Sequence, residues 1–103
     1  MEFTSVHYNS DRQTRRELIQ KIGEGNIIDS FVVDRGHPHG AEVHDVTDTA
    51  IIIIHNQQTK KLITELIARP EQLRRLYHQN GREVPKRILE LAYKHNMAGY
   101  NTM

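Results

Sequence analysis

The chain has 103 residues, of which 37% are hydrophobic, and 14 Lys and Arg against 13 Asp and Glu give a formal net charge of +1. A chain of this length forms one domain, residues 1–103, and the absence of cysteine excludes a disulfide framework, a thiolate nucleophile and a sulfur metal site. The longest apolar run, AIIII, is far shorter than the roughly 20 residues that span a bilayer, so we expect a soluble, cytoplasmic protein with no membrane partner.

Helix and strand signals alternate with turn residues over the first half of the chain. A helix is predicted to begin at Ser10 or Asp11, both suitable N-caps, and to end at the glycines of GEG, because leucine and isoleucine recur between them at helical spacing. Residues 27–34 are rich in β-branched side chains and end at the turn RGHPHG, which predicts a strand. Residues 41–46 and 50–55 are predicted as two more strands, joined by a short polar connection that is typical of a hairpin.

Residues 60–68 fit two structures. The polar sequence NQQT before them and their threonine and isoleucines fit the return strand of a hairpin. Periodicity instead favours a helix, because four apolar residues form a helical stripe: Leu62, Ile63, Leu66 and Ile67. Pro70 ends the segment in either case and can occupy the first turn of a helix that Gly81 closes. A last helix is predicted from Pro85 to about His95.

The sequence GAEVHDVTDTAIIIIHNQQTKKLITELIARPEQLRRLY resembles the strand-rich core of small toxin-type ribonucleases, the barnase, EndoU, colicin-nuclease and RelE superfamily. In these proteins a VH strand precedes an apolar strand, a polar turn and a strand that ends near ARP. The resemblance spans about residues 31–77 and implies that the ambiguous segment is a strand. The expected fold is then α+β, with an N-terminal helix, two C-terminal helices and a four-stranded antiparallel sheet at about 27–34, 41–46, 50–55 and 60–68.

The resemblance implies a metal-independent endoribonuclease of toxin type that needs no cofactor and cleaves RNA by transesterification to a 2′,3′-cyclic phosphate. RNA would be its substrate, and a protein inhibitor or antitoxin would be its partner. Such cleavage needs a base for the 2′-hydroxyl proton, an acid for the leaving 5′-oxygen and a cation for the charge that develops on the phosphate.

The predicted strand 41–46 brings two groups suited to proton transfer together. If Val43 points into the core, then Glu42 and His44 share the opposite, open face of the sheet, about 7 Å apart along the backbone. Each candidate also has an ordinary structural interpretation as a solvated or strand-ending residue. The predicted catalytic residues are Glu42 and His44 as the base, His55 or Thr64 as the acid, and Arg69 as the cation.

Phosphate recognition is predicted at two places. Arginines lie across the ARP boundary and in the first turns of the helix after it, where guanidinium groups and free backbone N–H groups can hold an anion. Histidines of the sequence GHPHG can contact phosphate or stack on a base. The predicted RNA-binding residues are His37, His39, Arg74 and Arg75.

Two alternatives to a ribonuclease remain. In the first, the basic C-terminal helices bind nucleic acid or a partner protein, and the histidines have no catalytic role. In the second, His37 and His39 ligate a metal ion together with His44 or Glu42 and leave one position open for water, although no second cluster of ligands is evident.

Overall fold

The computed structural model describes residues 11–99 and confirms the α+β fold. All four strands fall where the sequence predicts them, with ends that differ by at most two residues, and the ambiguous segment is a strand. Within the described residues, three helices accompany the sheet. In chain order the elements are α2 (Asp11–Ile22), β1 (Ile27–Asp34), β2 (Ala41–Thr47), β3 (Ile51–Asn56), β4 (Leu62–Ile67), α3 (Pro70–Gln79) and α4 (Lys86–Gly99). None of the helices within this part of the chain is long and apolar enough to span a bilayer.

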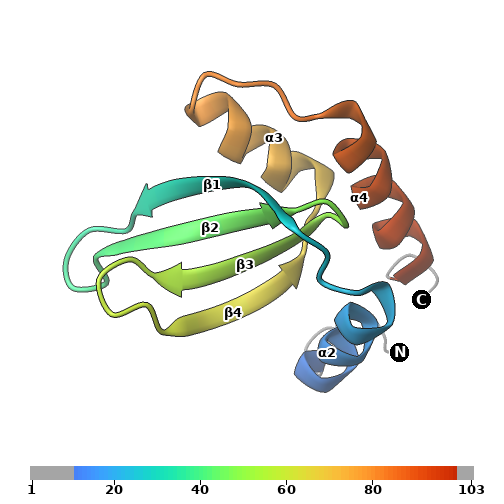
Figure 1. Cartoon of the computed structure of the whole chain (residues 1–103), viewed down its shortest axis with the longest axis horizontal. Helices are drawn as coiled ribbons and strands as arrows, with labels where there is room; N and C mark the ends of the chain where they lie inside the picture. Colours follow the sequence, from blue (N-terminus) through green and yellow to red (C-terminus); the bar gives the residue numbers. More distant parts are fainter. Residues whose placement is uncertain (1–10, 100–103) are drawn as a thin grey trace, which may run out of the picture.

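The sheet is an antiparallel meander in which every strand pairs with its neighbours in the sequence, in the order β1-β2-β3-β4. Figure 1 shows the turns β1–β2 and β3–β4 at one end of the sheet and the helices α2 and α4 toward the other. The arrangement follows from the short polar connections, because antiparallel neighbours need only a tight turn. The two turns therefore form a hairpin end that α2 and α4 leave uncovered.

Helices pack on both faces of the sheet. On one face, which we call the α3–α4 face, Phe31, Val46 and Ile52 pack with buried side chains of α3 and α4. On the other, the α2 face, Ile51 and Ile67 pack with Ile19 of α2. The isoleucine run of β3 serves both faces, because successive side chains of a strand point in opposite directions. Three of its members are buried, whereas Ile53 is only partly covered.

Hydrogen bonds fix the link between α2 and β1 to the turn between β2 and β3. The Thr49 hydroxyl lies 2.8 Å from the carbonyl oxygens of both Gly23 and Glu24, and the Asn26 amide donates to Asp48 over 3.0 Å. Gly25 in this link has φ +74, and a Cβ there would lie 2.2 Å from a carboxylate oxygen of Asp48, so only glycine fits. The link thus has a defined path beside the sheet.

Candidate functional site

Three side chains at the hairpin end form one hydrogen-bonded cluster. Nε2 of His44 lies 3.0 Å from Oε1 of Glu42, and Nε of Arg35 donates to the same oxygen over 3.1 Å. The side chain of Glu42 is 15% exposed and that of Arg35 51% exposed, whereas that of His44 is only 8% exposed. Glu42 and His44 therefore lie close together, as the sequence predicts, and the guanidinium of Arg35 is a third member of the cluster.

The electrostatics of the cluster keep the carboxylate charged. Burial alone would raise the pKa of Glu42, but the hydrogen bonds from His44 and Arg35 and the charge of the guanidinium outweigh it, so the pKa lies below its ordinary value of 4.5. An ionised carboxylate has no proton to donate, so Nε2 of His44 must be the donor. In a neutral ring Nδ1 then carries the lone pair.

The face on which these residues lie differs from the prediction. His44 pairs across the sheet with Phe31 and Ile54, and all three belong to the α3–α4 face, where His44 is buried. The expectation that Val43 points into that core and leaves the histidine on an open face is wrong. The cause is Val46, which is fully buried under the helices and has the same parity along β2 as His44.

Glu42 nevertheless lies at the margin of the core. It pairs with Val33 on β1 and with Asn56 on β3, and this row of the α3–α4 face is the one nearest to the two turns. All three side chains are only partly buried. The carboxylate thus borders the uncovered hairpin end, and the imidazole is one row further in.

Arg35 was not predicted, although the hairpin contains the signal for it. Because Val33 pairs with Glu42, the residue two positions further along the chain from Val33 lies diagonally opposite Glu42 on the same face. Diagonal neighbours are about 7–8 Å apart, within reach of a long side chain. The register of β1 with β2 therefore brings Arg35 to the carboxylate.

A second carboxylate–imidazole pair lies on the α2 face. Nδ1 of His55 is 3.6 Å from Oδ2 of Asp45, and the Ser30 hydroxyl donates to Oδ1 of the same carboxylate over 2.5 Å. The side chain of His55 is 25% exposed. His55 is therefore on the opposite side of the sheet from Glu42, so the structure does not bring these two predicted catalytic groups together.

The other predicted catalytic residues are also separated from the cluster. Thr64 lies in the same row as His44, but Ile54 intervenes, which places them about 10 Å apart at a strand spacing of about 4.8 Å. Arg69 follows β4 at the far end of the sheet, where its guanidinium lies 3.7 Å from Glu71. It does not reach the carboxylate of Glu42.

The predicted phosphate-binding residues do not form one site. Arg74 reaches across to α4, where its guanidinium donates to the Tyr93 hydroxyl over 2.6 Å and lies 5.6 Å from the ring centroid. Arg75 is exposed on α3. His37 and His39 are exposed in the β1–β2 turn, the connection that also contains Arg35. The turn histidines are thus near the cluster in the chain, and the α3 arginines are not.

No group of three or more His, Cys, Asp or Glu side chains that could hold a metal ion is found within residues 11–99. The alternative of a metal site at His37 and His39 therefore gains no support from the geometry. In comparisons with known proteins, no family model, curated protein or solved structure matches the chain. The function must therefore be argued from the residues themselves.

Another pair of ionisable groups lies between α2 and β4. A hydrogen bond between the side chains of Glu65 and Glu24, burial, and the charge of Glu24 together raise the pKa of Glu65 to about 7 from its ordinary value of 4.5. Two carboxyl groups at hydrogen-bond distance share a proton more readily than they both ionise. The pair is not part of the Glu42 cluster.

Because the folded-state pKa of Glu65 is raised, its contribution to stability is fully present below pH 4.5 and is lost as the pH rises through about 7. We expect the wild type to lose more stability than Glu65→Gln between pH 5 and pH 8, by about 1 kcal/mol once solvent screening is allowed for. Thermal unfolding of both proteins at the two pH values measures the difference. Glu90→Gln, on an exposed part of α4, should follow the wild type, and an identical pH dependence for Glu65→Gln would contradict the prediction.

Proposed function

We propose that the protein is a metal-independent endoribonuclease and that its site lies at the hairpin end of the sheet. The observation that carries the proposal is the cluster of Arg35, Glu42 and His44, in which a carboxylate held in its ionised form lies 3.1 Å from a guanidinium. A base and a cation side by side are two of the three groups that metal-free RNA cleavage needs. The resemblance to toxin-type ribonucleases points to the same reaction.

In the proposed reaction Glu42 takes the proton of the ribose 2′-hydroxyl. The 2′-oxygen then forms a bond to phosphorus, and the bond from phosphorus to the 5′-oxygen breaks. Arg35 neutralises the charge that the phosphate oxygens gain as the fifth bond forms. The products are a 2′,3′-cyclic phosphate and a free 5′-hydroxyl.

The acid that protonates the leaving 5′-oxygen is assigned to the β1–β2 turn. His37 and His39 are exposed there, between Arg35 and Glu42 in the sequence. Imidazole is the side chain that most often acts as a general acid in this role. His44 is a positioning residue in this scheme, because it is buried and holds the carboxylate of Glu42 by its Nε2–H group.

A toxin-type ribonuclease acts on the RNA of the cell that it poisons, so a cytoplasmic location and a protein inhibitor or antitoxin as partner belong to the proposal. The inhibitor is expected to cover the hairpin end, because access of RNA to Glu42 depends on that end being open.

The test is cleavage of RNA by the purified wild-type protein in the presence of a chelator. We expect cleavage products that end in a 2′,3′-cyclic phosphate, detected by mass spectrometry, and no loss of rate when the chelator is added. A preparation of Glu42→Gln made in the same way controls for contaminating nuclease. Absence of cleavage on every RNA tested, or cleavage that the chelator abolishes, would reject the proposal.

A second candidate function, non-catalytic binding of single-stranded nucleic acid, is favoured by the contact between Arg74 and Tyr93. Tyr93 is 44% exposed, and the guanidinium of Arg74 lies 5.6 Å from its ring centroid, so the two groups form a cationic surface on which a base can stack. This function predicts RNA affinity that decreases with salt and is lost in Tyr93→Ala. The ribonuclease proposal predicts cleavage that does not depend on Tyr93.

A further inference from the structure

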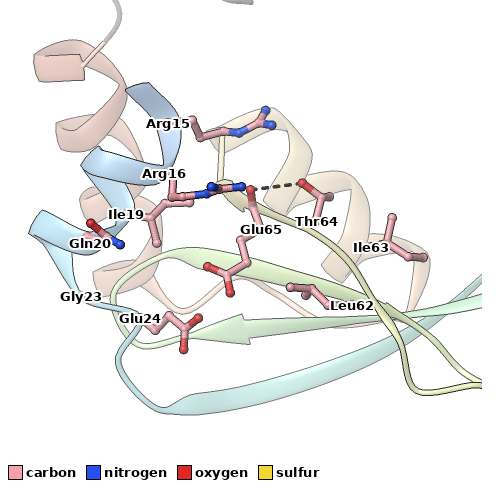
Figure 2. A pocket seen from close by; sticks show the side chains of 10 residues that line it. All are labelled: Arg15, Arg16, Ile19, Gln20, Gly23, Glu24, Leu62, Ile63, Thr64 and Glu65. Carbon is pink, nitrogen blue, oxygen red and sulfur yellow. Dashed lines mark hydrogen bonds between the residues drawn. The ribbon is translucent and has the colours of Figure 1, made fainter. Parts of the chain in front are cut away.

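A cavity of about 660 Å³ is lined by residues of α2, of the link after it and of β4, away from the Glu42 cluster. Figure 2 shows that α2 contributes two arginines, the link after it contributes Glu24, and β4 contributes Glu65. The β4 wall consists of four consecutive residues, 62 to 65, although a regular strand presents only alternate residues to one side. β4 is an edge strand of the sheet and has a β-bulge here, since His55 pairs with Leu62 and Ile54 with Thr64, which leaves Ile63 as an extra residue.

The charges that line this cavity do not neutralise one another. In Figure 2 the carboxyl groups of Glu24 and Glu65 point toward each other across the lower part of the cavity, and Arg15 and Arg16 lie above them. Neither arginine forms an ion pair within the described part of the chain. The cavity therefore holds a cationic wall and an anionic wall, and each lacks a counter-ion of its own.

Because the positive and negative side chains lie on separate walls, the cavity suits a ligand with a positive charge at one end and a negative charge at the other. Its cation would replace the proton that the two carboxyl groups share, and its anion would contact the guanidinium groups, which bind carboxylate and phosphate well. Leu62 and Ile63 are 60% and 50% exposed, and they offer apolar surface to one side of the charged groups (Figure 2). The volume falls within the range of about 300–1,000 Å³ that is typical of small-molecule sites.

We propose that this cavity binds a small zwitterion, with its ammonium group at Glu24 and Glu65, its carboxylate or phosphate at Arg15 and Arg16, and Leu62 and Ile63 as apolar surface beside it. The site is independent of the ribonuclease proposal, because it shares no residue with the cluster at the hairpin end. Binding of the ammonium group at neutral pH releases the proton that the carboxyl pair shares. The charged groups that line the cavity around that proton are Arg15, Arg16, Glu24 and Glu65.

The probe for the test is ε-aminocaproate, which has an ammonium group and a carboxylate at the two ends of a short aliphatic chain. Titration of the ¹⁵N-labelled protein should shift the amide resonances of residues 62 to 65 and of α2, with a dissociation constant on the order of 1 mM for so small a ligand. Hexylamine and hexanoate, each of which keeps one charged end, should bind at least about tenfold more weakly. Calorimetry at pH 6 in two buffers of different ionisation enthalpy should detect release of a proton.

Variants distinguish the cavity from general charge attraction. Glu65→Gln and the double variant Arg15→Gln, Arg16→Gln should each weaken binding of ε-aminocaproate about tenfold or more, whereas Glu90→Gln, outside the cavity, should bind as the wild type does. The first change is isosteric and the second affects exposed or half-exposed side chains, so the unchanged part of the spectrum reports that the fold is retained. No resonance shift at tens of millimolar probe, equal binding of hexylamine, or equal binding by the cavity variants would each overturn the proposal.

Discussion

Glu42→Gln is expected to lower kcat/KM for RNA cleavage by roughly 10²–10⁴-fold, the effect of removing one general acid–base group. Glutamine keeps the size of the side chain and can still accept a hydrogen bond from Nε2 of His44 or Nε of Arg35, but its amide cannot take the proton of the 2′-hydroxyl. The loss should therefore appear without unfolding. Single-turnover cleavage of a defined RNA, with circular dichroism of each protein, measures both properties.

The matched control is His55→Ala. The two carboxylate–imidazole pairs lie on opposite faces of the sheet: Glu42 and His44 are both on β2, whereas Asp45 of β2 is paired with His55 of β3. A site at the hairpin end of the α3–α4 face predicts that His55→Ala retains activity. Full activity of Glu42→Gln together with loss in His55→Ala would instead place the reaction on the α2 face.

The rest of the cluster predicts a graded series. Arg35→Ala should reduce activity because the phosphate loses its cation, and Arg35→Lys should restore part of it, since a lysine keeps the charge but not the planar guanidinium. Of His37→Ala and His39→Ala, one should reduce the rate strongly and identify the acid. Equal, wild-type rates for both histidine variants would remove the turn from the mechanism and leave the assignment of the base intact.

The sequence predicts the strands well because their local signals agree with their burial. β1 and β3 are runs of β-branched residues between turn signals, and the structure changes their ends by at most one residue. β4 was ambiguous because Leu62, Ile63, Leu66 and Ile67 fit a helical stripe. Pairing with β3 decides the matter, since Ile51 lies opposite Ile67 and Ile52 opposite Leu66, a long-range contact that no local pattern contains.

The candidate site was only partly predictable for a related reason. Two residues next but one on a strand always share a face, so the contact of Glu42 with His44 follows from strand geometry alone. The face that they share cannot be derived in the same way. Val43 and Val46 point to opposite faces of the sheet, and either valine could be the one that packs in the core. Arg69 was predicted from its position in the resemblance, but it follows β4 at the end of the sheet that is far from the cluster. The contact of Arg35 with Glu42 can be predicted only when the register of β1 with β2 is known.

Ile52→Asp is expected to unfold the protein. Ile52 is fully buried on the α3–α4 face, between Val46 and Leu66 in neighbouring strands, so the new carboxylate would have neither water nor a cation. A small domain has about 5–15 kcal/mol of stability, and even Ile52→Ala, which removes only methyl and methylene groups, should cost about 2–5 kcal/mol of it. Urea denaturation followed by circular dichroism gives both values.

The control for this change is the same substitution one strand away. Ile63 is 50% exposed at the bulge of β4, so Ile63→Asp leaves the charge in water and should change the free energy of unfolding by no more than about 0.5 kcal/mol. The contrast between the two isoleucines tests the division of the β-branched residues into core and surface. A cooperative unfolding transition of Ile52→Asp near that of the wild type would contradict the prediction. It would mean that β3 is not buried between the two layers of helices, and the position of Glu42 at the margin of the core would then be wrong as well.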